Sequence, residues 1–86
     1  MPLSVARWKE VRRVNFDKLV AFMDPYFAHF LSDDAEVAAE VLGLDLSSKL
    51  VDGHSHLVVD RRDWNPTVER LNAAGHQVCF TDAHVD

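Results

Sequence analysis

The sequence predicts a small α+β domain, or a small α/β domain, with a helical N-terminal half followed by strand, helix and strand. Apolar residues recur every three or four positions through residues 5–42, a spacing typical of helices. Two short apolar runs follow, at 57–59 and 78–80, on either side of a segment with helix start and stop signals. The 86 residues are 48% hydrophobic and 27% charged, which suits one globular domain spanning 1–86. We expect two to four short helices and a sheet of two or three strands.

The N-terminal half begins with the signals of two helical segments. Ser4 is a suitable N-cap for a first helix, because its hydroxyl can accept a hydrogen bond from the first turn. A second apolar stripe with helical spacing covers residues 16–31. Asp24-Pro25 interrupts that stripe, because proline removes a backbone donor and is favoured at the first turn of a helix. We predict a kink or break in the helical segment at this point.

A further helix is predicted from Ala35 to Leu42. Asp33 and Glu36 have the spacing of a capping box, in which each side chain bonds the other's backbone N–H. Gly43 follows the last apolar position and is suited to a left-handed C-cap.

The second half opens on a strand or a hairpin. Residues 49–51 and 54–60 would form two strands around Asp52-Gly53, a dipeptide that accepts the positive φ angles of a tight turn. A single strand centred on residues 57–59 is the simpler alternative.

A helix and a final strand complete the predicted order. Asn65-Pro66 begins a helix that reaches Ala74, and Gly75 ends it. A short strand then covers His76–Thr81. Strand, helix and strand together suggest a right-handed βαβ unit with parallel strands, although the short crossover leaves an antiparallel arrangement open.

Composition favours a soluble, acidic, cytoplasmic protein. The only cysteine is Cys79, which fits a reducing compartment, and no run of 18 apolar residues or secretory signal is present. We therefore expect no membrane partner. The net charge of −5 is unevenly divided: residues 1–18 contain five basic and two acidic residues, whereas residues 19–86 contain four basic and twelve acidic ones. A basic end can meet an anionic partner or be a solvated helix face.

The histidines suggest a metal-binding hypothesis. On a strand, His54, His56 and Asp60 would share one face, and two imidazoles with a carboxylate are suitable ligands for a divalent metal. His84 would join them from the final strand if the two strands were neighbours. The alternative is that the protein has no cofactor and that these imidazoles lie on a strand edge.

The segment from Leu50 to Leu57 contains Asp-Gly-His-Ser-His and resembles the first-strand metal signature of the amidohydrolase superfamily. Members of that superfamily bind a divalent metal with these two histidines at the end of a barrel strand. The resemblance implies the same role for His54 and His56. The similar segment covers eight of 86 residues, and a (β/α)₈ barrel needs roughly 250. The resemblance is therefore restricted to a local site built on another fold.

Nucleic-acid binding is an alternative function. Residues 34–44 resemble the first helix and turn of helix-turn-helix proteins, and residues 58–64 resemble the wing and following helix of excisionase-type winged-helix domains. Under that resemblance Lys49, Arg61 and Arg62 would contact phosphates. The segment that would read DNA, residues 45–52, is short and acidic at both ends, so DNA is the less favoured partner.

The leading hypothesis is a small non-catalytic interaction or regulatory protein, such as an accessory subunit, an inhibitor, an antitoxin or an immunity protein. No catalytic set is evident, since Cys79 lies in an apolar strand and the glycines are isolated. Tryptophan beside arginine is a composition typical of interface hot spots. The predicted partner-binding residues are Arg7, Trp8, Arg12, Arg13, Arg61, Arg62 and Trp64. The partner would be another protein or a second copy of the chain.

Overall fold

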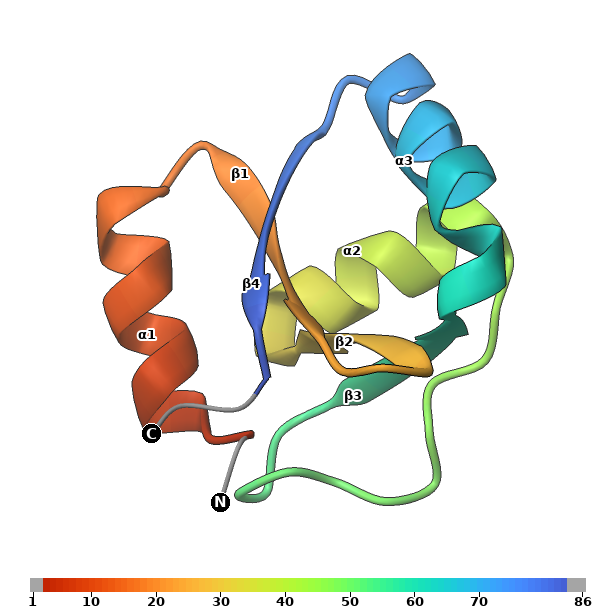
Figure 1. Ribbon diagram of the computed structural model, residues 1–86. Helices are drawn as coiled ribbons and strands as arrows, with labels where there is room; N and C mark the ends of the chain where they lie inside the picture. The colour runs from red at the N-terminus through yellow and green to blue at the C-terminus, as the bar shows by residue number, and fades with distance from the viewer. Residues whose placement is uncertain (1–2, 84–86) are drawn as a thin grey trace.

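The computed structural model describes residues 3–83 and has three α-helices and a four-stranded mixed sheet within that range (Figure 1). The prediction of a small α+β fold is confirmed at that level. In chain order the elements are α1 (Val5–Val14), β1 (Lys18–Met23), β2 (Phe27–Leu31), α2 (Ser32–Leu42), β3 (His56–Asp60), the 3₁₀ turn η1 (Arg61–Asp63), α3 (Trp64–Ala73) and β4 (Gln77–Asp82).

The sheet has the strand order β3-β2-β1-β4. β2 is antiparallel to both β1 and β3, whereas β1 and β4 are parallel. It follows that β1, β3 and β4 run in the same direction and that their carboxyl ends lie at one end of the sheet. Figure 1 shows α2 and α3 on one side of the sheet and α1 on the other.

The core therefore has two layers, with β1 between them. Leu19, Ala21 and Met23 face the layer under α2 and α3, whereas Val20 and Phe22 face α1. All five side chains are buried. A strand covered on both faces is apolar at nearly every position rather than at every second one.

The helical prediction for residues 16–31 is wrong, because β1 and β2 occupy that range. The continuous apolar run of β1 satisfies the helical template by accident, since a doubly buried strand has no alternation to distinguish it. The break at Asp24-Pro25 is at the predicted place, but it joins two strands. Asp24 Oδ1 accepts hydrogen bonds from the backbone N–H groups of Tyr26 (2.7 Å) and Phe27 (2.6 Å) and fixes a tight turn. The sheet consequently has four strands instead of two or three.

The strands β3 and β4 are parallel, but they lie at opposite edges of the sheet with β2 and β1 between them. Neighbouring strands are about 4.8 Å apart, so the two edges are separated by roughly 14 Å. The two strands are therefore not neighbours, which was the condition for His84 to join the other predicted metal ligands. The crossover through α3 spans the whole sheet, because the two N-terminal strands are inserted at its centre.

Local turn chemistry was predicted more accurately. Ser4 Oγ accepts a hydrogen bond from Arg7 N (3.1 Å), and Gly43 ends α2 with φ of 68°. The Asp52-Gly53 turn has φ angles of 50° and 78°, with a single bridge between its flanking residues rather than a full hairpin.

The predicted capping box does not cap α2. The chain passes from β2 into α2 without a linker, through Ser32 with φ of 55°, and the N-cap position is Leu31, which makes no side-chain cap bond. Glu36 accepts a hydrogen bond from the Ser55 hydroxyl instead (3.3 Å).

Candidate functional site

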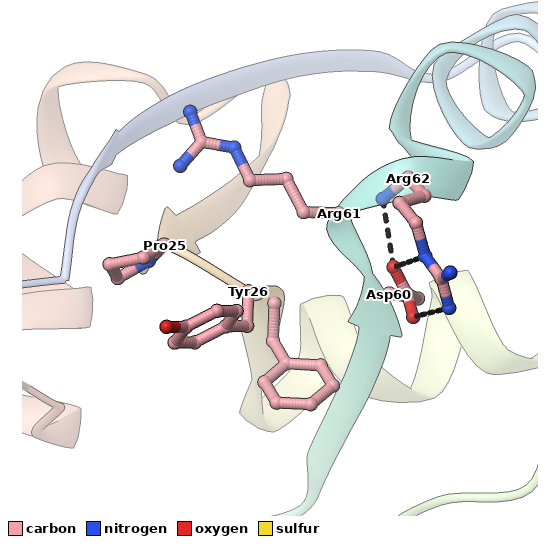
Figure 2. A pocket seen from close by; sticks show the side chains of 6 residues that line it. Pro25, Tyr26, Asp60, Arg61 and Arg62 are labelled. Carbon is pink, nitrogen blue, oxygen red and sulfur yellow. Dashed lines mark hydrogen bonds and ion pairs between the residues drawn. The ribbon is translucent and has the colours of Figure 1, made fainter.

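The carboxyl ends of β1 and β3 carry a hollow lined by aromatic and arginine side chains. Its volume is about 560 Å³, and it lies between the β1–β2 turn and the start of η1 (Figure 2). The lining residues are Pro25, Tyr26, Phe27, Asp60, Arg61 and Arg62. We call Tyr26, Phe27, Arg61 and Arg62 the aromatic–arginine surface. Two of its four members, Arg61 and Arg62, belong to the partner-binding set predicted from the sequence.

The two aromatic side chains are exposed and their backbone is fixed. Tyr26 is 74% exposed and Phe27 is 42% exposed. The Asp24 carboxylate holds the backbone of both residues, and the Asp24 N–H bonds the Phe27 carbonyl at 2.9 Å. Two large rings are therefore presented to solvent on a turn with little backbone freedom left to lose.

Arg61 connects this turn to η1. Its backbone N–H donates to the Tyr26 carbonyl (2.9 Å), and its guanidinium Nη1 donates to the Asp24 carbonyl (2.9 Å). Figure 2 shows the Arg61 side chain extending from η1 towards Pro25. Within residues 3–83 it forms no ion pair with a carboxylate, so its positive charge is not neutralised by direct contact.

Arg62, in contrast, is paired with Asp60. Its Nε and Nη2 donate to the two carboxylate oxygens at 3.2 and 3.0 Å, and its backbone N–H adds a third bond (2.9 Å). The side-chain hydrogen bond from Arg62 lowers the pKa of Asp60. This pair forms a planar, charge-balanced rim to the hollow (Figure 2).

A second hollow, of about 260 Å³, lies on the other side of the two arginines and includes Trp64 and Phe80. The two rings meet edge to face, with centroids 6.1 Å apart. Trp64 also packs against the buried Phe30, whereas Phe80 is 66% exposed. Trp64, another residue of the predicted partner-binding set, is therefore half-buried at the base of this hollow.

The predicted N-terminal group around Trp8 has an internal role. Trp8 is only 8% exposed, and its Nε1–H donates to Asp34 Oδ2 at 2.9 Å. Arg12 donates to Asp34 Oδ1 at 3.0 Å, and Arg7 lies over the Phe22 ring, 5.1 Å from its centroid. These contacts attach α1 to the sheet and to α2.

Arg13 is the fourth predicted partner-binding residue on α1, after Arg7, Trp8 and Arg12, and its side chain is exposed on the surface.

The predicted metal ligands are directed to different partners. His54 Nδ1 lies 3.1 Å from Ser32 Oγ, and Asp60 is bonded to Arg62. His56 Nε2 lies 2.9 Å from His29 Nδ1, and His84 is outside the described residues. Among residues 3–83, no three His, Cys, Asp or Glu side chains are arranged to hold a metal ion.

The contact between His29 and His56 was not predicted. The rings are stacked, with centroids 5.2 Å apart and an interplanar angle of 16°. They are 8% and 9% exposed on the sheet face that carries α1, next to Phe27, whose ring meets His29 edge on. His29 was hidden from sequence reasoning because residues 27–31 were assigned to a helix. Once they form β2, strand alternation places His29 on the same face as His56.

A buried chain of hydrogen bonds runs through the histidine pair. His29 Nε2 lies 2.6 Å from Asp24 Oδ2, and His56 also bonds the backbone of Lys49. The chain ends at Asp24, the same carboxylate that fixes the Tyr26 turn.

Hydrogen bonding and burial shift the pKa values of two groups in this chain of contacts, Asp24 and His56. Burial acts to raise the pKa of Asp24, but hydrogen bonds from His29, Tyr26 and Phe27 outweigh it and lower that pKa to about 2. Burial, together with the charge of His29, lowers the pKa of His56.

The segments on which the nucleic-acid hypothesis depends do not form a helix-turn-helix. Residues 45–52 form no helix, so the element that would follow α2 in a helix-turn-helix is a loop. Lys49 is exposed on this loop, and Arg61 and Arg62 belong to η1. Within residues 3–83, no helix is long and apolar enough to cross a bilayer.

Comparison with known proteins gives no assignment. No family model matches the chain, and no curated protein matches it significantly.

Proposed function

We propose that the protein is a small non-catalytic binding module whose aromatic–arginine surface docks a partner protein. The observation that carries this proposal is the exposure of Tyr26 and Phe27 on a fixed turn, beside an arginine with no carboxylate partner within residues 3–83. Tyrosine and arginine are enriched in the residues that dominate binding energy at interfaces. A surface whose backbone is already ordered also loses less conformational entropy when it binds.

The charges of the site define the partner's chemistry. The Arg61 guanidinium donates to a neutral carbonyl. At the rim of the hollow, in contrast, the charge of Arg62 is balanced by that of Asp60. A carboxylate on the partner would meet Arg61, and an adjacent apolar or aromatic side chain would cover Tyr26. The proposed partner is therefore a protein segment that places an acidic residue beside an apolar one. This pairing is worth more on a partly desolvated surface than between two free side chains.

The test is a quantitative capture experiment with matched variants. The purified protein serves as bait in cell extract of its source, in parallel with Tyr26→Ser, Arg61→Gln and a control variant, Phe16→Ser. Phe16 is 77% exposed and precedes β1, at the opposite end of the sheet from the site. We expect a protein retained by the wild type and by Phe16→Ser that is lost with both site variants.

The captured protein is then purified and titrated against each variant by calorimetry. We expect the Kd to rise at least tenfold for Tyr26→Ser and for Arg61→Gln, and to stay unchanged for Phe16→Ser. Circular dichroism confirms that each variant is folded. A partner bound equally well by all four proteins, or no binary binding, would contradict the proposal.

A further inference from the structure

The two edges of the sheet differ in whether other backbone segments bond to them. The outer edge of β3 is partly covered, because Ser47 N–H from the preceding loop donates to the His56 carbonyl at 2.7 Å. β4 is the other edge strand and pairs with β1 on its inner side. Within residues 3–83, no backbone group from another segment bonds its outer side. Figure 1 shows β4 passing between α1 and α3 as the edge of the sheet.

The composition of β4 does not protect this edge. Its first five residues, Gln77 to Thr81, contain no charge, proline or glycine. Lysine, proline and bulges are the usual devices that keep an edge strand from pairing with another chain. Phe80, in the middle of this strand, is 66% exposed. The strand is therefore suited to pair along its free side.

We propose that two copies of this chain associate through β4, paired antiparallel about a two-fold axis, to form a continuous eight-stranded sheet. The proposal is independent of the function proposed above, because the aromatic–arginine surface lies at the end of the sheet and not along its edge. Most homodimers are two-fold symmetric, and a two-fold axis perpendicular to a sheet brings the same edge strand together antiparallel.

Symmetry and side-chain direction restrict the register. Val78 and Phe80 lie on the face of α3, whereas Cys79 lies on the face of α1. Residues directly opposite in an antiparallel ladder share a face, so the axis must pass through a residue and not between two. The candidates near the middle of the strand are therefore Cys79 and Phe80.

Side-chain matching within β4 selects Cys79 as the centre. With the axis there, Val78 is opposite Phe80 of the second copy. An aromatic ring beside a β-branched side chain is a favourable cross-strand pair. With the axis at Phe80, the Asp82 carboxylate would be opposite the apolar Val78. The first register also places the two Asp82 carboxylates further apart, because each is then three residues from the axis instead of two.

The mass of the protein in solution provides the first test. Sedimentation velocity and light scattering over a hundredfold range of concentration should show a reversible monomer–dimer equilibrium. Phe80→Glu should raise the dimer dissociation constant at least tenfold, because it places a carboxylate opposite Val78. The matched control is Val14→Glu at the end of α1, where the side chain is 77% exposed and lies outside the sheet. A monomer at every concentration, or a dimer that Phe80→Glu leaves intact, overturns the proposal.

Disulfide trapping tests the register. Oxidation by oxygen with copper–phenanthroline should join two Cys79 thiols, each losing one proton and one electron while oxygen is reduced to water. Opposite residues place their Cβ atoms about 4.5–5.5 Å apart, close to the separation that a disulfide needs.

A second set of variants removes any dependence on access to Cys79. In a Cys79→Ser background, the double variant Gln77→Cys/Thr81→Cys should form covalent dimers, because residue 77 is opposite residue 81 of the second copy. The single variant Gln77→Cys in that background should not. Covalent dimers from the single variant, or none from the double variant, overturn the proposed pairing.

Discussion

Replacing Asp34 with alanine should remove a large share of the protein's stability, although the residue is not part of the aromatic–arginine surface. Asp34 is 1% exposed in the first turn of α2 and accepts three hydrogen bonds. The donors are Trp8 Nε1 (2.9 Å), Arg12 Nη1 (3.0 Å) and the backbone N–H of Val20 (3.0 Å). The carboxylate thus joins α1, β1 and α2 at one point. It also accepts the hydrogen bond of the Val20 backbone N–H, at the position where the pairing of β1 with β2 has ended because the chain turns into α2.

The magnitude follows from the partners that would be left behind. Each buried donor that loses its acceptor costs about 1–3 kcal/mol, and breaking a buried ion pair costs about 3–5 kcal/mol in total. Arg12 is about one third exposed and can recover part of its hydration, so we expect a loss of about 3–5 kcal/mol. A chain of this length is stable by roughly 4–13 kcal/mol, so the loss removes a large share of the total.

Urea denaturation followed by circular dichroism measures this loss directly. The matched control is Asp33→Ala, which removes the same charge from the adjacent, exposed position of the same helix turn. Asp34→Asn should be intermediate, because one oxygen remains as an acceptor while the amide NH₂ group faces a donor. The reasoning is refuted if Asp34→Ala costs no more than Asp33→Ala, since desolvation of the carboxylate would then have offset its three hydrogen bonds. Burial does raise the pKa of Asp34, so the two effects compete at this site.

Three further outcomes are expected. The contributions of His56 and Asp24 to stability should fall as the solution is acidified, since the folded-state pKa of His56 lies below 6.5 and that of Asp24, at about 2, lies below 3.8. The raised pKa of Asp34 acts in the opposite direction at acid pH, so the test is made at higher pH. Melting temperatures should decrease as the pH falls just below 6.5, and His56→Gln should flatten this part of the curve. Gly43→Ala should cost about 1 kcal/mol in urea denaturation, because φ of 68° strains any other residue, and an unchanged midpoint would argue against a left-handed cap. Leu71→Ala should cost about 2–5 kcal/mol, because this fully buried side chain holds α3 against the sheet, and a cost below 1 kcal/mol would mean that α3 packs loosely.

The parts of the fold that could be predicted from the sequence are those encoded by a few adjacent residues. Ser4, Gly43 and the Asp52-Gly53 turn were identified because a hydroxyl cap and a positive φ depend on local chemistry. β1 was missed because its apolar run fits a helix and a doubly buried strand equally well. The choice between them depends on α1 and α2 covering the two faces, which is tertiary information.

The candidate site shows the same division. Proximity in the sequence predicted that Arg61, Arg62 and Trp64 lie close together. They do so because η1 continues directly into α3. The histidine pair needed the register between β2 and β3, which no local pattern encodes. Trp8 was expected at the surface from its basic neighbours. It is buried instead. The prediction failed because charged residues flank the apolar stripe of a helix and do not show which helix face is covered.

The position of β1 at the centre of the sheet has a consequence for folding on the ribosome. Lys18 to Met23 pair in parallel with Gln77 to Asp82, so one side of the central strand has no partner until β4 has been synthesised. The hairpin β1–β2, α2 and β3 can associate earlier, since their contacts are closer along the chain. During that interval, the most apolar strand of the protein has a free side that another nascent chain could occupy. The rate at which β4 docks therefore determines how long each new molecule is open to misassembly.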